Sequence, residues 1–180
     1  MKVRPSQPTA VSRQIDTWRL IAVLGMATYF VWAAQVSFDQ SLIGTFNLIM
    51  HEAGHWVFGI FGRFLGILGG SLMQVLVPFV FAVAFFGQRQ PLGVAFCLMW
   101  TGQSSLEVAT YAGDAVARSL PLLGGEAVVH DWHWLLLELG WLSHTEFIAA
   151  GLAFASWFIL GFGIAYGLTV ALGAKVPGSS

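Results

Sequence analysis

Two histidines and a glutamate stand close together in an apolar part of this sequence. His51, Glu52 and His55 form the pattern H-E-x-x-H. Positions i and i+4 share one face of a helix, so the two imidazoles can bind one zinc ion at about 2.0–2.1 Å. Glu52 lies about 100° round the helix from His51, where it can take a proton from water and pass it to a leaving amine. The pattern predicts a hydrolytic zinc site with Glu52 as general base and acid.

The apolar surroundings of the motif strengthen this interpretation. Ionisable side chains at membrane depth cost about 2.5–3.5 kcal/mol each on insertion scales, so three of them within five residues need a compensating interaction. A divalent cation bound by these side chains supplies such an interaction. A hydrogen-bonded polar cluster that joins helices, or a proton relay in a carrier, would be the alternatives.

A hydrolytic zinc site has three protein ligands and a fourth position for water, so a third ligand must come from elsewhere in the chain. Glu107 and Asp114 lie seven residues apart on one face of a later apolar segment. Glu107 is nearer the middle of that segment and could instead contact Gln103, whereas Asp114 has the shorter side chain and precedes a loop. His130 and Asp131 are further candidates, although Asp131 also suits the first turn of a helix.

The composition indicates a membrane protein. Of the 180 residues 57% are hydrophobic and 9% are charged, against roughly 25% charged in soluble domains. Eight Lys and Arg against nine Asp and Glu give a net charge of -1. The chain therefore has no basic surface for nucleic acid, and nucleic-acid binding is excluded. The single cysteine, Cys97, cannot form a disulfide within the chain.

We expect an all-α, polytopic transmembrane bundle of about five spans, because a bilayer core needs about 20 apolar residues for each helix. The expected spans are residues 20–38, 41–64, 64–88, 92–117 and 147–174. In the third, Gly69-Gly70, Gln74 and Pro78 predict irregular or re-entrant backbone. The glycine patterns at 62, 66 and 70 and at 163 and 167 predict close helix approach.

The organisation is a polar tail, residues 1–19, followed by a single domain, residues 20–175. Four of the eight basic residues precede the first span, namely Lys2, Arg4, Arg13 and Arg19. The positive-inside rule then places this tail in the cytoplasm, and five complete spans would put the C-terminus outside.

Residues 118–146 form the one sizeable loop expected outside the membrane. Within it Asp131 to Leu142 is predicted to form a short helix in the membrane interface. Its apolar stripe would be Trp132, Leu136 and Leu139, with Asp131 and Glu138 on the opposite side.

With the zinc motif in the second span, the chain resembles the site-2 protease family of intramembrane zinc metalloproteases, and most of all its small bacterial members without a PDZ domain. The resemblance covers roughly residues 41–120 and lies in His51-Glu52-Ala53-Gly54-His55, in Gly69-Gly70 and in an acid on a later span. It implies a multi-pass protein of the bacterial inner membrane. The lipid bilayer and a membrane-protein substrate would be its partners, and zinc its cofactor.

The resemblance also implies roles for individual residues. His51 and His55 would be zinc ligands, Glu52 the catalytic acid and base, and an aspartate the third ligand, which favours Asp114 here. In the family this aspartate is commonly followed by glycine and preceded by asparagine and proline. The nearest phrase in this chain, 120–125, reads LPLLGG and holds leucine at that place.

Two other functions fit the same sequence. One is a catalytically silent zinc-binding membrane module that binds the transmembrane helix of a partner. The other is a transporter that uses the polar residues as an ion path, which would be expected to show internal repeats. We find no repeat in the sequence.

Overall fold

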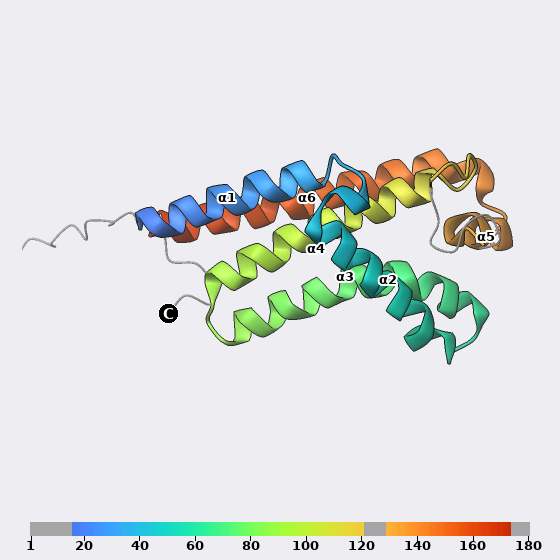
Figure 1. Cartoon of the computed structure of the whole chain (residues 1–180), viewed down its shortest axis with the longest axis horizontal. Helices are drawn as coiled ribbons and strands as arrows, with labels where there is room; N and C mark the ends of the chain where they lie inside the picture. The colour runs from blue at the N-terminus through green and yellow to red at the C-terminus, as the bar shows by residue number, and fades with distance from the viewer. Residues whose placement is uncertain (1–15, 121–128, 174–180) are drawn as a thin grey trace, which may run out of the picture.

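The computed structural model describes residues 16–120 and 129–173, which form helices and contain no strand (Figure 1). The α-helices are α1 (Thr17–Ala33), α2 (Leu42–Gly59), α3 (Arg63–Gly87), α4 (Pro91–Gly113), α5 (Asp131–Glu138) and α6 (Thr145–Ala171). Two single-turn 3-10 helices, η1 (Phe38–Gln40) and η3 (Leu142–His144), precede α2 and α6. The predicted all-α class is confirmed.

Within the described residues two helical stretches are long and apolar enough to cross a membrane. They are Arg63–Gly87, with a mean hydropathy of 2.1, and Leu142–Ala171, with a mean hydropathy of 2.0. Helix α1 is apolar but shorter. Of the five expected spans, these two therefore have the length and apolarity of a membrane-crossing helix, and the five-span bundle is not confirmed. Helices α2 and α4 carry polar side chains such as Asn47 and Gln103, which are buried inside the bundle.

Helix α4 is the centre of the bundle, with α6 along one side, α3 along another and α1 against both α4 and α6 (Figure 1). Glycines allow the closest of these approaches. A Cβ atom on Gly163 would lie 2.8 Å from the backbone nitrogen of Met99, and one on Gly102 would lie 2.5 Å from that of Leu160. The predicted close approach at 163 and 167 is confirmed, since Gly167 likewise faces Val23.

The beginning of α1 and the end of α6 lie at the same end of the bundle. The backbone N–H of Asp16 donates to the carbonyl oxygen of Ala171 at 3.2 Å. Helix α1 ends about half-way along α6, and the chain continues into α2, which runs toward the other end (Figure 1). Five complete crossings would have placed these two points on opposite sides. The expected location of the C-terminal end outside the membrane stays a prediction, since both chain ends lie beyond the described residues.

Helix α3 is continuous through Gly69 and Gly70, so the expectation of irregular backbone there is wrong. A helix satisfies its own backbone groups, which irregular chain in an apolar bundle cannot do. Pro78 has no N–H for the carbonyl oxygen of Gln74, four residues earlier. The hydroxyl of Ser104 on α4 donates to that oxygen at 2.9 Å instead. The proline thereby ties α3 to α4 beside Gln74.

Helix α5 is shorter than the predicted Asp131 to Leu142 and lies at one end of the bundle, against α3 and α4 (Figure 1). Its buried residues are Asp131, Leu135 and Leu136. The expectation that Asp131 faces away from the apolar side is wrong, because the first turn of α5 points into the bundle.

Candidate metal centre

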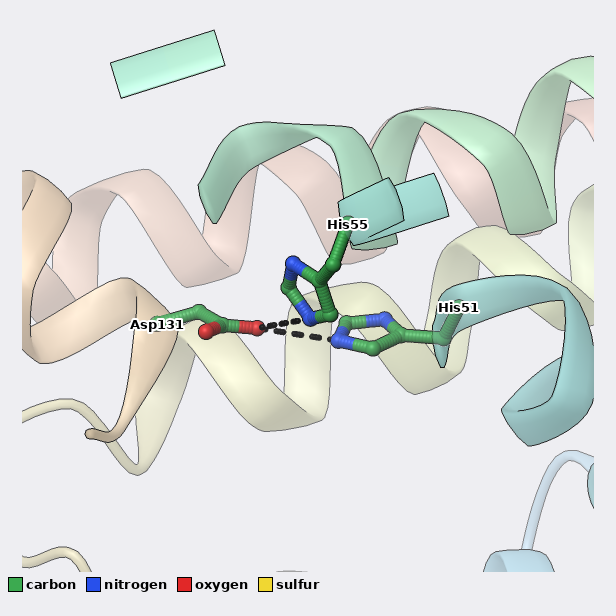
Figure 2. A group of neighbouring side chains, drawn as sticks. All are labelled: His51, His55 and Asp131. Atoms are coloured by element: carbon green, nitrogen blue, oxygen red, sulfur yellow. Dashed lines mark hydrogen bonds and ion pairs between the residues drawn. The ribbon is translucent and has the colours of Figure 1, made fainter. Parts of the chain in front are cut away.

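Two histidines of α2 and an aspartate of α5 point toward one another (Figure 2). The Oδ2 atom of Asp131 lies 2.9 Å from Nε2 of His51 and 3.3 Å from Nε2 of His55. The ligand atoms of the three residues lie within 4.8 Å of one another. In a tetrahedral zinc site with bonds of 2.0–2.1 Å, neighbouring ligand atoms are about 3.3 Å apart. This His-His-Asp group could therefore hold a metal ion.

Hydrogen bonds on the other ring nitrogens orient both histidines. Nδ1 of His51 lies 2.8 Å from Oε1 of Gln74, and Nδ1 of His55 lies 2.9 Å from the carbonyl oxygen of Gly66. The amide of Gln74 is oriented by its Nε2, which donates to the carbonyl oxygen of Ser104 at 3.2 Å. Because both partners accept only, each Nδ1 carries a proton, as in most metal-binding histidines.

The two Nε2 atoms are left facing a carboxylate. In a neutral ring whose Nδ1 is protonated, Nε2 offers only a lone pair. Two such lone pairs at 2.9 and 3.3 Å from Oδ2 of Asp131 repel it unless a cation lies between them. Either extra protons on the rings or a single metal ion removes this repulsion. The donor set of two imidazoles and one carboxylate suits zinc.

Glycines bring α3 close enough to support this arrangement. A Cβ atom on Gly70 would lie 2.6 Å from Nε2 of His51, and one on Gly54 would overlap the carbonyl oxygen of Gly69. Gly54, in the middle of the motif, thus lets the backbones of α2 and α3 touch. The ring of His51 consequently lies directly over the backbone of α3, within reach of Gln74.

Helix α5 is fastened to α3 by its tryptophans. The indole N–H of Trp132 donates to the hydroxyl of Ser71 at 3.0 Å. The guanidinium carbon of Arg63 lies 4.8 Å from the ring centre of Trp134, a cation–π contact. These contacts set the position of Asp131 at the start of α5.

Asp131 is ionised in this position. Burial acts to raise the pKa of its carboxyl group, but when the two rings carry the extra protons, hydrogen bonds from His51 and His55 outweigh burial and hold the pKa below its usual value. A metal ligand must be deprotonated, so the surroundings of Asp131 favour the form that binds a cation.

Asp114, the favoured third ligand from the sequence, lies elsewhere. Its carboxylate follows the last turn of α4 and accepts the backbone N–H groups of Ser119 and Leu120, each at 2.9 Å. Burial raises the pKa of Asp114, but the amides of Leu120 and Ser119 outweigh it and hold the pKa below its usual value. The structure brings Asp131 to the two histidines in place of Asp114, which instead stabilises the turn that follows α4.

The other two candidates are also engaged outside the His-His-Asp group. Glu107 accepts from Nδ2 of Asn47 at 2.7 Å and from Nε2 of Gln103 at 2.6 Å. It therefore makes the polar contact with Gln103 that the sequence suggested. His130 precedes α5, where its Nδ1 accepts the N–H of His133 at 3.2 Å and its Nε2 lies 3.3 Å from Asp114.

Glu52 lies beside the group and lines two cavities. The linker-side cavity, about 350 Å³, is formed with residues 34–38 between α1 and α2. The turn-side cavity, about 460 Å³, lies at the turn between α2 and α3 and is lined by Gly62 and the start of α3. Both cavities are lined by His51, Glu52 and Tyr111. Glu52 makes no hydrogen bond or ion pair to another residue of the described ranges, so its carboxylate is open to whatever fills these cavities.

Sequence reasoning named Gln74 only as a sign of irregular backbone, and it missed Tyr111 altogether. Gln74 is polar within an apolar run and lies four residues after Gly70, hence on the same face of α3. Tyr111 lies four residues after Glu107 on α4. These spacings could have shown that Tyr111 shares a face with the candidate ligand Glu107, and Gln74 a face with Gly70, but not which face meets α2.

No family model, curated protein or solved structure matches this chain.

Proposed function

We propose that this chain is an integral membrane zinc metallopeptidase that hydrolyses a peptide bond within a transmembrane segment of another membrane protein. One observation carries the proposal: Nε2 of His51 and Nε2 of His55 converge on the carboxylate of Asp131 while each Nδ1 donates to an oxygen. In this proposal the three zinc ligands are His51, His55 and Asp131.

The chemistry divides between the metal and Glu52. Zinc bound by three protein ligands polarises a carbonyl group and favours ionisation of water near neutral pH. Glu52 takes a proton from the attacking water as the water oxygen bonds to the carbonyl carbon. It then gives that proton to the nitrogen as the C–N bond breaks. The open position of Glu52 on both cavities supports this role.

The outer surface of the bundle supports a location in the bilayer. Large apolar side chains point outward from several helices, including Leu42 at 86% exposure, Trp56 at 84% and Phe147 at 81%. Soluble monomers rarely expose so many. The resemblance to small bacterial site-2 proteases agrees with a multi-pass protein of the inner membrane. Substrates that reach Glu52 would then come from the membrane.

The test begins with the zinc content of detergent-purified protein. The zinc-loaded protein and its Glu52→Gln variant are then reconstituted with a panel of single-span reporter proteins. Each reporter carries a central Gly-Pro pair, because these residues destabilise a helix and expose its peptide bonds. We expect about one zinc in both proteins, cleavage by the wild type, and cleavage at least about 100-fold slower in the variant, the lower end for loss of a general base.

The other outcomes separate the competing functions. Absence of zinc after supplementation would overturn the metal centre itself. Zinc without cleavage of any reporter would overturn the peptidase and favour the silent module that binds a partner helix. Equal cleavage by Glu52→Gln would remove Glu52 from the mechanism.

A further inference from the structure

The hydroxyl of Tyr111 is tied to the candidate metal centre through Asp131. It accepts the backbone N–H of Asp131 at 3.1 Å, and the same residue directs its carboxylate to His51 and His55. The Tyr111 ring is also in edge contact with the His51 ring, with ring centres 5.8 Å apart. The phenol therefore stands beside the metal-binding group, on the α4 side.

The proton of this hydroxyl is available. A phenol has one O–H donor besides its lone pairs and is protonated at neutral pH. The N–H of Asp131 occupies a lone pair, and no group in residues 16–120 and 129–173 accepts the proton. Tyr111 lines both the linker-side and the turn-side cavity. Its donor can thus point at a molecule bound in either cavity.

Packing holds the ring in place before any substrate arrives. Tyr111 lies against His130, with ring centres 4.3 Å apart, and His130 is itself 3.3 Å from Oδ2 of Asp114. Together with the bond from Asp131, these contacts fix both the plane of the ring and the position of its oxygen. A donor fixed in this way needs no reorganisation when charge develops near it, and such donors stabilise transition states strongly.

We propose that Tyr111 is a second catalytic residue, whose hydroxyl donates a hydrogen bond to the scissile carbonyl oxygen as negative charge develops there. The inference rests on the proposed peptidase function. Glu52, on α2, moves the proton from water to the leaving amine. Tyr111, on α4, keeps its proton throughout, and no covalent bond to it forms or breaks. The substrate carbonyl would lie between these two groups.

A purely structural role is the competing explanation, because the same oxygen accepts the N–H of Asp131. Loss of that bond would displace the third ligand and weaken zinc binding. Loss of the donor would leave zinc binding intact but weaken binding of a group that resembles the transition state. Tyr111→Phe removes both the acceptor and the donor. The two roles therefore differ in which of these two affinities falls further in this variant.

The matched control is Tyr29→Phe, because the Tyr29 hydroxyl also accepts a backbone N–H, that of Ile43 at 3.1 Å, away from the metal group. Three quantities are measured in each variant: zinc affinity, kcat and KM on a cleaved reporter, and calorimetric affinity for a phosphinic peptide. The tetrahedral phosphorus group of this peptide replaces the scissile amide.

For Tyr111→Phe, assayed at saturating zinc, we expect a fall in kcat of about 100-fold or more, with KM within about threefold of the wild type. Zinc affinity should fall far less than kcat, by the part that the lost contact with Asp131 contributes. Phosphinic peptide affinity should fall by a factor similar to that for kcat/KM. Tyr29→Phe should change none of these. Unchanged phosphinic peptide binding, or zinc affinity that falls as far as activity, would overturn the inference. A wild type that cleaves nothing would instead overturn the peptidase proposal, so the two failures are distinguishable.

Discussion

Nε2 of His51 lies 2.9 Å from Oδ2 of Asp131, although 80 residues separate them in the chain. The contact exists because α5 folds back over the ends of α3 and α4 and directs its first residue into the bundle. It joins the conspicuous motif of α2 to an acid outside the long helices.

Zinc content should distinguish the two aspartates. Asp131→Ala removes a proposed ligand, so we expect the purified variant to lose its zinc. Asp114→Ala should keep about one zinc, because its carboxylate binds the amides of Ser119 and Leu120 instead. Metal analysis of both variants beside the wild type makes the comparison. Zinc lost only from Asp114→Ala would restore Asp114 as the third ligand.

Asp114 should contribute to stability in a pH-dependent way. Removing its carboxylate leaves two backbone N–H groups without their partner, a cost of about 1–3 kcal/mol each when buried. Its pKa is below the usual value in the folded protein. The contribution of Asp114 to the free energy of unfolding is therefore fully present above the pKa of about 3.9 that the group has in the unfolded chain. It is lost as the pH falls through the lower pKa of the folded protein. We expect the Tm difference between wild type and Asp114→Asn to shrink on acidification below about pH 4; a constant difference would contradict the assignment.

Gln74→Leu should weaken zinc binding without removing a ligand. His51 would lose the acceptor that orients its ring, and loss of such a partner typically costs 10–100-fold in metal affinity. Competition with a zinc chelator measures the change. Gln88→Leu, at the exposed end of the same helix, is the control and should bind zinc as the wild type does. Equal affinities in the two variants would rule out this role for Gln74.

Gly70→Ala should disturb the same ring by contact. The added methyl group would lie 2.6 Å from Nε2 of His51, too close for the ring to keep its position. We expect zinc affinity to fall at least about tenfold, as for other groups that orient a ligand. In contrast, a Cβ on Gly87 meets nothing within 4 Å, so Gly87→Ala serves as the control in the same chelator titration. An unaltered zinc affinity in Gly70→Ala would show that the helices adjust.

Labelling of single cysteines should place both ends of the bundle relative to the membrane. In a Cys97→Ser background, Thr17→Cys and Leu172→Cys should react from the same side, because Asp16 bonds to Ala171. Arg118→Cys, just beyond the far end of α4, should react from the other. Impermeant maleimide added to intact cells and to inverted vesicles measures this. Labelling of positions 17 and 172 from opposite sides would favour an odd number of crossings.

The local part of the site could be predicted from the sequence. The i and i+4 spacing of His51 and His55 places two imidazoles on one face of any helix, whatever packs against it. Composition predicted an all-helical chain for a similar reason, since long apolar runs satisfy their backbone groups within a helix. Such features depend on residues that are neighbours in the chain.

Tertiary structure decided which distant residues join that face. Asp114, Glu107 and Asp131 have similar chemistry, and nothing in their spacing from His51 separates them. Asp131 lies beside the two histidines because Trp132 and Trp134 attach α5 to α3. The carboxylate of Asp114, in contrast, accepts hydrogen bonds from the turn that follows α4. Gln74 and Tyr111 likewise reach the His-His-Asp group only because α3 and α4 pack beside α2. Contacts across many residues depend on how helices pack, and packing is a property of the whole bundle that no local pattern contains.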